Sequence, residues 1–361
     1  MCQRSGLFDL NAYRQVRFYY LAMPHHRRRT PSDLPGLDLA EQRSWQNYLE
    51  AALRFDTAMN RRLAGEHQLS VLDLRVLDVL RKADSVFVRM GDLAAATGAL
   101  PGQLTKRVQR LENRDLVDRE RCAHDRRAVL ATITGQGRTV AERATMTYAH
   151  GVKQDLVGSL SRTQLVVIEE NCRRVVERLN PHAARLSSCH LPGLDDGETR
   201  CWRAFVDSGT GLVARLNRSL TDAVNLSLVD VFLLDTLAKS EAGSARMTDL
   251  AQAFDLAPSR VTQQIDRLEA QGLARRVPSP TDRRVVLAAV TDVALARLEL
   301  AISRYAREIR AYYLDPLSRQ QMIALGDSCR RITPSPNVTD AQLNWTSIGF
   351  GKQAARPMSA H

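Results

Sequence analysis

The chain repeats itself at a distance of 157 residues. Leu69 to Thr134 aligns without a gap with Leu226 to Thr291, and 27 of these 66 pairs are identical. A match of this length is far above chance and indicates a duplicated module. What one copy does, the whole chain is therefore expected to do twice.

Composition places the chain among globular proteins. Its 361 residues leave room for two domains that each bury a core, and 44% are hydrophobic and 25% charged. The sequence contains no long uncharged apolar run, so no membrane span is expected. Charged residues near the N-terminus interrupt the region where a signal peptide would need an apolar stretch. The six cysteines form no CxxC pair. We therefore expect a cytoplasmic protein without a metal site or a disulfide framework.

The chain is strongly basic, with a net charge of +11 and a pI near 9.7. Such a balance favours a polyanionic partner, although an arginine-rich protein can also simply be soluble. Charge alone therefore leaves nucleic acid open, and the motifs have to decide.

The boundaries follow from the repeat and from proline-rich stretches. Residues 1–36 match nothing in the second half and are predicted to be a basic flexible extension, either solvated or touching DNA phosphates. We predict a first domain at 37–180, a linker at 181–197 and a second domain at 198–333. Residues 334–361 are expected to be a disordered tail.

Each copy begins with two predicted helices. Apolar residues spaced three and four apart place Trp45 on one face of a helix from Asp38 to Leu63, and Trp202 is its counterpart. Gly209 and Gly211 should weaken the second copy of this helix by up to about 1 kcal/mol each. Ser70-Val-Leu-Asp73 and Ser227-Leu-Val-Asp230 are capping boxes that start the second helix.

A helix-turn-helix follows in both copies. A short helix over 92–96 leads through a turn at 97–99 into a helix that starts at Pro101 and ends near Arg114; the second copy runs from Pro258 to about Gln271. Short alternating segments at 116–121 and 129–134, and at 273–277 and 286–290, predict β-hairpins. A helix-turn-helix with a hairpin is a winged helix.

Two more helices close each copy. The last of them starts at the capping boxes of Ser161 and Ser318. Its narrow apolar stripe suits a helix–helix seam; the stripe comprises Leu165, Ile168, Cys172, Val175 and Leu179, and in the second copy Met322, Leu325, Cys329 and Ile332. The predicted fold is mainly α with small β-hairpin wings.

In this order of elements each copy resembles a complete MarR-family transcriptional regulator. The resemblance covers about residues 38–180 and 196–333. It implies a winged helix that binds operator DNA as a dimer, usually represses, and often releases DNA on binding a small phenolic, aromatic or lipophilic effector. It also implies an effector pocket between the first, second and fifth helices of each copy. Family members normally carry one such module, so two in one chain are a departure.

The second helix of each helix-turn-helix supplies the candidate base-reading residues. Side chains on its outer face can enter the major groove, where arginine suits guanine and glutamine suits adenine. The candidates are Gln103, Thr105, Lys106, Arg107 and Arg110 in the first copy, and Ser259, Arg260, Thr262, Gln263, Gln264 and Arg267 in the second. For each residue the alternative is a solvated helix face. Leu104, Val108 and Leu111, with Val261, Ile265 and Leu268, are expected in the core.

The hairpin tips supply a second set of candidates. The family's Asp-x-Arg pattern maps onto Asp125 and Arg127, and onto Asp282 and Arg284, with Arg126 and Arg283 between them. An arginine at a tip can enter a narrow minor groove, and the aspartate can hold its guanidinium. The alternative is an exposed ion pair worth under about 1 kcal/mol.

Two modules in one chain predict an intramolecular pseudo-dimer that shares one helical dimerisation layer. The alternative is a homodimer with four winged helices. The first copy has Lys106 and Arg107 at the positions where the second copy has Gln263 and Gln264. We therefore predict an operator with unequal half-sites and a stronger salt dependence from the first module.

Other function classes find less support. No catalytic or phosphate-binding motif is present, so the chain is not expected to be an enzyme or to carry a cofactor. Redox sensing through Cys172 and Cys329, or through Cys122 at a wing tip, stays open as an alternative. A winged-helix module that binds proteins instead of DNA is a further alternative, which the charged wing tips disfavour.

Overall fold

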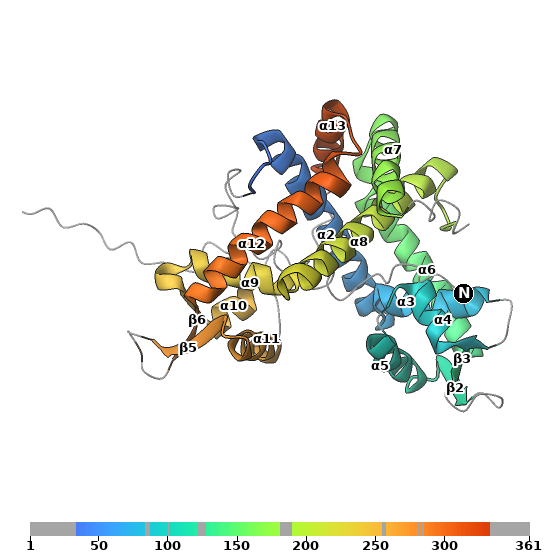
Figure 1. Cartoon of the computed structure of the whole chain (residues 1–361). Helices are drawn as coiled ribbons and strands as arrows, with labels where there is room; N and C mark the ends of the chain where they lie inside the picture. The colour runs from blue at the N-terminus through green and yellow to red at the C-terminus, as the bar shows by residue number, and fades with distance from the viewer. Residues whose placement is uncertain are drawn as a thin grey trace, which may run out of the picture.

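The computed structural model describes residues 34–83, 87–99, 101–121, 128–180, 190–254, 258–279, 282 and 285–332. They form two winged-helix modules that meet in one layer of long helices (Figure 1). The fold is mainly α with small antiparallel sheets, as predicted.

The first module contains α2 (Leu39–His67), α3 (Val71–Lys82), β1 (Val88–Arg89), α4 (Met90–Thr97), α5 (Pro101–Glu112), β2 (Val117–Arg121), β3 (Val129–Ile133), α6 (Gly135–Asp155), η2 (Val157–Ser159) and α7 (Arg162–Leu179). The second contains α8 (Asp196–Val224), α9 (Leu228–Lys239), η4 (Glu241–Gly243), β4 (Ser244–Arg246), α10 (Met247–Ala253), α11 (Pro258–Ala270), β5 (Ala274–Pro278), β6 (Val286–Val290), α12 (Asp292–Ile309), η5 (Arg310–Leu314) and α13 (Arg319–Cys329). The order of elements is the same in both, so the repeat in the sequence is a repeat of the fold.

Capping boxes start the long helices in matching pairs. Ser70 and Ser227 cap α3 and α9, and Ser161 and Ser318 cap α7 and α13, each with the side chain three residues on bonded back to the cap. All four were predicted from sequence. A reciprocal cap satisfies backbone N–H groups that the first helical turn leaves unpaired, which fixes where each helix begins.

Each module carries a three-stranded sheet, with strand orders β1-β3-β2 and β4-β6-β5. The predicted hairpins are present: Val117 pairs with Ile133, and Ala274 pairs with Val290, both antiparallel. The third strand of each sheet, β1 or β4, was not expected. These strands are only two and three residues long, which is too short for a visible alternation of apolar and polar residues.

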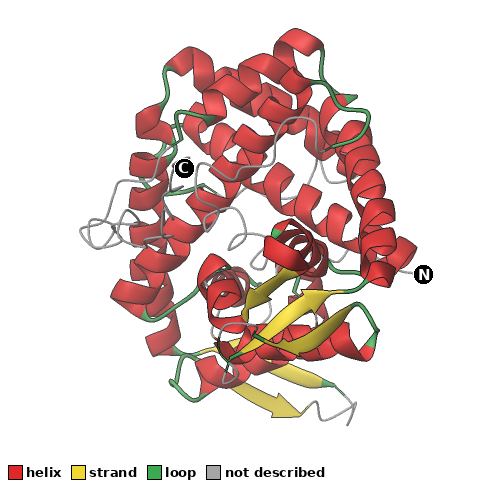
Figure 2. Ribbon diagram, turned by 90° about the vertical axis from the view of Figure 1, so that its left-hand side faces the viewer, coloured by secondary structure: helices red, strands yellow, loops and turns green. Residues whose placement is uncertain are grey.

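The two modules share one helical layer. The last helix of each packs against the first helix of the other, α7 on α8 and α13 on α2, and α7 also contacts α13. Figure 1 shows these long helices converging above the two winged-helix heads, and Figure 2 shows the sheets at the edge opposite the layer. The predicted apolar stripe of α7 and α13 is buried in this layer, apart from the half-buried Leu179.

Each of two ion pairs across the layer has a counterpart formed by the equivalent residues of the other half. Asp38 contacts Arg319 at 2.6 Å, and Asp195, 157 residues after Asp38, contacts Arg162 at the same distance. Glu41 and Arg310 (2.8 Å) are likewise matched by Glu198 and Lys153 (2.6 Å). Each contact thus occurs twice, with the roles of the two halves exchanged. This is the property of an isologous interface, in which both partners use the same surface. The two halves are therefore related by a pseudo-twofold axis.

The first module starts earlier than the sequence suggested. Leu34 and Leu37 are buried, and so are their counterparts Leu191 and Leu194. Both pairs lie in the same five-residue sequence, Leu-Pro-Gly-Leu-Asp at 34–38 and 191–195. Its glycine has a φ near +78° in both copies, a conformation that glycine adopts without strain.

Several predicted segments lie outside the described residues. They are 1–33 of the predicted extension, 181–189 of the predicted linker and the tail from 333 on. The remainder of the predicted linker leads into α8, which starts at Asp196 and runs unbroken through the buried Gly209 and Gly211 to Val224.

Candidate DNA-binding surface

The recognition helices α5 and α11 are anchored by a buried apolar face. Leu104, Val108 and Leu111 of α5 are at most 1% exposed, and so are Val261, Ile265 and Leu268 of α11. This confirms the predicted core positions. Burying three such side chains per helix holds each helix against its module and turns the opposite face outward.

Most candidate base-reading residues lie on that outer face. Exposed are Thr105, Lys106, Arg110, Ser259, Arg260, Thr262, Gln263 and Arg267; partly buried are Gln103, Arg107 and Gln264. Two of the hydroxyls are engaged locally, because Thr105 donates to the carbonyl of Pro101 and Thr262 to that of Pro258. Both helices lie along the lower side of the molecule in Figure 1, away from the shared helical layer.

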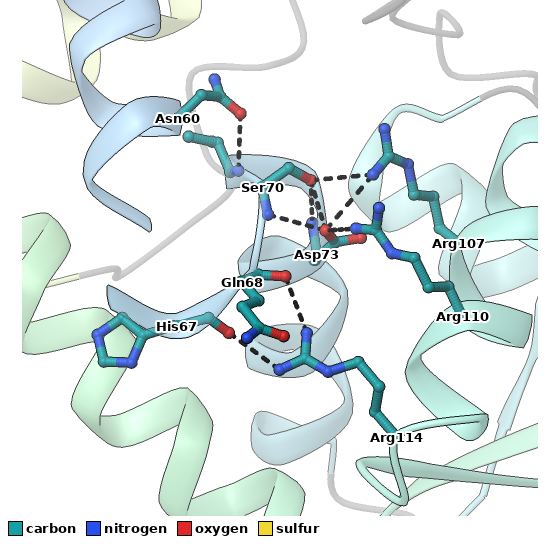
Figure 3. A network of polar contacts seen from close by, with 9 residues as sticks. Asn60, His67, Gln68, Ser70, Asp73, Arg107, Arg110 and Arg114 are labelled. Carbon is teal, nitrogen blue, oxygen red and sulfur yellow. Dashed lines mark hydrogen bonds and ion pairs between the residues drawn. The ribbon is translucent and has the colours of Figure 1, made fainter. Parts of the chain in front are cut away.

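Arg110 does more than face solvent. Its guanidinium forms an ion pair with Asp73, the fully buried capping residue of α3 (Figure 3). The same Asp73 Oδ2 also accepts from the backbone N–H of Ser70 at 2.8 Å, from the Ser70 hydroxyl at 2.7 Å and from Arg107 at 3.5 Å. One carboxylate thus joins the start of α3 to the middle of the recognition helix. This contact was not expected from the sequence.

The second module repeats this arrangement with one change. Arg267 forms an ion pair with the buried Asp230, and Gln264 donates to Asp230 Oδ1 at 2.5 Å. Gln264 stands where the first module has Arg107. In the first module the corresponding oxygen, Asp73 Oδ1, has no hydrogen-bond partner among the described residues. The buried carboxylate therefore faces two guanidinium groups in one module, but one guanidinium and a neutral amide in the other.

Further arginines orient the end of α5 and the wing. Arg114 donates to the carbonyls of Gln68 and His67 at the end of α2, at 2.8 and 3.0 Å (Figure 3). Arg119 of β2 donates to Gln109 of α5 at 2.6 Å and forms an ion pair with Glu112. Charge-assisted contacts of this kind fix orientation as well as adding stability. They hold the wing strand against the recognition helix.

The wing contact recurs in the second module. Arg276 of β5 forms ion pairs with Asp266 and Glu269 of α11. These three residues are the counterparts of Arg119, Gln109 and Glu112. Both wings are therefore fixed relative to their recognition helices.

The wing tips lie largely outside the described residues. Asp125, Arg126 and Arg127 belong to the segment 122–127, and Arg283 and Arg284 also fall outside. Asp282 is described and is exposed. The Asp-x-Arg hypothesis for the tips therefore stays a prediction.

A cavity of about 230 Å³ lies beside α5, at the seam between the modules. Its apolar wall includes Phe55 and Met59 of α2 and Tyr148 of α6. Its basic wall comprises Arg75 of α3, Lys106 and Arg107 of α5, and Arg260 of α11. The cavity lies between α2, α3 and α6, where the resemblance places an effector pocket of the first module, and Arg260 of the second module's recognition helix also lines it.

The described cysteines are poorly suited to redox chemistry. Cys172, Cys201 and Cys329 are all buried. Burial raises the pKa of Cys172 to about 12, and it raises the pKa of Cys201 and Cys329 as well. The thiolate is the reactive form, and at neutral pH these thiols are protonated. Cys122 lies outside the described residues.

Neither a metal centre nor a membrane span is found in the described part of the chain. No three His, Cys, Asp or Glu side chains there converge as metal ligands. None of the helices there combines the length and apolar character needed to cross a bilayer.

Comparison with known proteins identifies the same family in both halves. Two models of the MarR family match, one over residues 67–128 and the other over residues 226–286. Each match spans the helix-turn-helix and part of the wing of one module.

Similar sequences are bacterial regulators. The HTH-type transcriptional repressor MdtR of Bacillus subtilis is 28% identical over 112 residues, which are 31% of this chain and 70% of that protein. The uncharacterized HTH-type transcriptional regulator YhbI of Bacillus subtilis is 32% identical over 94 residues, 26% of this chain and 61% of that protein.

Two of the similar solved structures come from Streptomyces coelicolor. The MarR-family regulator Sco3205, solved in complex with DNA, is 29% identical with a TM-score of 0.38, covering 42% of this chain and 94% of that one. AbsC, of the same family, is 26% identical with a TM-score of 0.37, covering 40% and 98%.

Proposed function

Because this chain carries two MarR-family winged-helix modules in tandem, we propose that it is a transcriptional repressor that binds double-stranded DNA in a sequence-specific way. The observation that carries the proposal is the pair of recognition helices α5 and α11, whose outer faces are polar and exposed on the same side of one molecule. The net charge of +11 supports a polyanionic partner. The similarity to MdtR, described as a repressor, supports repression.

We further propose that one chain acts as a complete pseudo-dimer. DNA-binding dimers set two recognition helices about one helical turn, roughly 34 Å, apart. The matched ion pairs Asp38–Arg319 and Asp195–Arg162 join the halves of a single chain in the manner of a twofold dimer. They support a single chain that occupies both half-sites.

We propose that some outer-face side chains of the recognition helices only contact DNA, whereas two arginines also position their helix. Lys106, Arg260 and Gln263 are exposed on the outer faces and are the leading candidates for contact with DNA. Arg110 and Arg267 remain about half exposed, with side-chain exposures of 48% and 49%, while they hold Asp73 and Asp230. Each can therefore position its helix and still offer N–H groups to a phosphate or a base.

The two half-sites are proposed to differ. The outer face of α5 carries Lys106 and Arg107, where α11 carries Gln263 and Gln264. Cationic side chains favour phosphate and guanine, and glutamine favours adenine. A single chain with unlike reading heads does not require a palindrome.

Selection of bound duplexes from a random DNA pool, with the mass of the complex measured by light scattering, tests the proposal. We expect two unequal half-sites about one helical turn apart, held by one chain. A palindrome bound by two chains would overturn the pseudo-dimer, and no enrichment over the pool would overturn DNA binding itself. A Lys106→Glu, Arg260→Glu double variant is the control, because it keeps the fold's buried contacts but should enrich no sequence.

A further inference from the structure

Several side chains on the outer faces of α5 and α11 already have partners inside the protein. Arg107 and Arg110 of α5 turn toward the buried carboxylate that caps α3 (Figure 3). Gln264 and Arg267 of α11 bind the equivalent carboxylate at the start of α9. Removing a partner from a buried carboxylate costs free energy. These four side chains can still touch a phosphate, but they are less free to follow the pattern of a base pair.

Two hydroxyls and two side chains that face the wings are engaged as well. Thr105 and Thr262 donate to the carbonyl one helical turn back, at 2.9 and 3.0 Å. Gln109 and Asp266 contact the arginine of the neighbouring wing strand. In the part of the chain that the structure describes, each recognition helix keeps one pair of long polar side chains without a hydrogen bond or an ion pair. They are Gln103 and Lys106, the α5 pair, and Arg260 and Gln263, the α11 pair.

The two pairs occupy equivalent places near the start of each recognition helix. Gln103 and Arg260 are the third residues of their helices, and Gln103 is the only one of the four that is partly buried. Lys106 and Gln263 are the sixth residues. Residues three apart lie on one helix face, about 4.5 Å apart along the axis, and neighbouring base pairs are about 3.4 Å apart. Each pair is therefore spaced to contact two neighbouring base pairs in the major groove.

The order of the two side-chain types is reversed between the helices. From its N-terminal end, α5 presents an amide and then a cation, whereas α11 presents a cation and then an amide. A cationic side chain suits guanine, and glutamine suits adenine. Under the pseudo-twofold axis, equivalent residues face symmetry-related base pairs. The two half-sites are therefore read with adenine and guanine exchanged.

We propose that the α5 pair reads one half-site and the α11 pair reads the other, and that the half-sites differ by an exchange of adenine and guanine at two neighbouring positions. Gln264, in contrast, is a positioning residue that holds its helix on α9. This inference rests on the proposed DNA-binding function. It goes further because it names the two positions at which the operator departs from a palindrome.

Two variants that make the recognition helices alike test the proposal. Gln103→Arg with Lys106→Gln gives α5 the α11 pair. Arg260→Gln with Gln263→Lys gives α11 the α5 pair. Each exchange leaves the net charge unchanged, so the charge-dependent, sequence-independent part of DNA binding should be preserved. The two variants are matched controls for each other, because they should produce symmetric half-sites of opposite pattern.

Selection from a random duplex pool is carried out with the wild type and with both variants. The wild type should enrich half-sites with the two bases exchanged, and each variant should enrich half-sites that are symmetric at these positions. Fluorescence anisotropy should show each variant binding its own duplex at least about tenfold more tightly than the wild-type duplex. Thermal unfolding midpoints confirm that both variants are folded.

Three results would overturn the inference. If folded variants enrich the same duplexes as the wild type, or none, the two pairs do not read the half-sites. If the wild type enriches half-sites with the same order of bases, the inference fails while the proposed DNA-binding function stands. If the wild type enriches no duplex, the proposed function fails and the inference fails with it.

The role of Gln264 is tested against that of its neighbour. Gln264→Ala should weaken binding to the wild-type duplex and to each single-base change of that duplex by the same factor. Gln263→Ala should instead abolish the discrimination, at least about tenfold, at the one base pair where adenine is selected. If Gln264→Ala selectively loses the preference for adenine, Gln264 is a reading residue and its assignment is wrong.

Discussion

The indole N–H of Trp45 in the first module donates to the hydroxyl of Tyr305 in the second, at 3.1 Å, with both side chains buried. The counterpart contact runs the other way across the layer, from Trp202 to Tyr148 at 3.3 Å. The tryptophan predicted in the first helix of each copy thus bonds to the opposite module. The first helices are therefore part of the inter-module contact as well as of their own cores.

Tyr305→Phe should destabilise the protein more than Tyr148→Phe. The first change leaves the fully buried indole N–H of Trp45 without a partner, at a cost of about 1–3 kcal/mol. Trp202 is only half-buried, so water can replace the lost hydroxyl and the cost should stay below about 1 kcal/mol. Urea unfolding followed by tryptophan fluorescence measures both, and equal losses would contradict the expectation.

Gly326→Ala should loosen the contact between α13 and α2. A β-carbon on Gly326 would lie 2.7 Å from Cα of Ser44, so one helix has to move, at about 1–3 kcal/mol. Gly65→Ala is the matched control, because nothing lies within 4 Å of a β-carbon there and alanine favours the helix by up to about 1 kcal/mol. The midpoint of thermal unfolding should be lower than that of the wild type for Gly326→Ala and higher for Gly65→Ala. An unchanged midpoint for Gly326→Ala would mean that the helices are less closely packed.

Stability should fall below about pH 4 partly through the matched ion pairs. The Arg319 guanidinium beside Asp38 lowers the pKa of that carboxyl below its ordinary value of 3.8, and the backbone N–H of Glu198, with Arg162, does the same for Asp195. A carboxyl with a lowered folded-state pKa binds fewer protons folded than unfolded, so its contribution is complete above the unfolded pKa and is lost as pH falls through the folded one.

Asp38→Asn with Asp195→Asn should therefore flatten the acid side of the stability profile, while asparagine still caps both helices. Urea midpoints between pH 2.5 and 7 give the comparison. The control is the double variant Asp92→Asn with Asp249→Asn, which changes two acidic residues that lie outside the inter-module layer. If the Asp38, Asp195 double variant keeps the wild-type slope, these carboxyls are not linked to folding.

The salt dependence of DNA binding should come mainly from the first module. Replacing Lys106 and Arg107 by glutamine should lower the slope of log affinity against log salt by up to about 2, since each neutralised phosphate contributes about 0.9. Gln263→Ala with Gln264→Ala should weaken affinity and leave the slope unchanged. Fluorescence anisotropy of a labelled duplex at about 50 to 300 mM salt gives the slope for each double variant. An equal drop in both slopes would rule out the asymmetry.

Reversing the charge of both wing tips should lower duplex affinity at least about tenfold, because an arginine near a narrow minor groove sits in a strongly negative potential. The change is Arg127→Glu with Arg284→Glu. The same net change made on the helical layer, Arg173→Glu with Arg330→Glu, controls for overall charge. If both pairs of variants weaken binding equally, the wings have no special role.

Features that depend on neighbouring residues could be predicted from the sequence. The capping boxes at Ser70 and Ser161 and their copies depend on side chains three residues apart, so the helix starts are as predicted. The core faces of α5 and α11 follow from helical periodicity alone. The repeat then doubles each inference, because a pattern found twice at one spacing is rarely accidental.

Features that depend on residues far apart in the chain could not be predicted from the sequence. Arg110 and Asp73 are 37 positions apart in the sequence and meet only because α3 packs against the recognition helix. Arg110 was therefore predicted as a base contact without its buried partner. The difference between Arg75 and Phe232 was visible in the sequence, but only the fold shows that Arg75 borders a cavity and that Phe232 is buried. The recurring Leu-Pro-Gly-Leu-Asp segment could have been found by extending the comparison upstream, since it is identical in both copies.

The packing of α7 on α8 and of α13 on α2 lies within a single polypeptide. Dilution separates a two-chain repressor into inactive monomers, and its operator occupancy then varies with the square of chain concentration. Because the two halves of this chain are covalently joined, dilution cannot separate them, and the effective concentration of modules joined in this way is on the order of millimolar. If one chain occupies both half-sites, as we propose, operator occupancy varies with the first power of chain concentration, so that even a few copies per cell respond in proportion to their abundance.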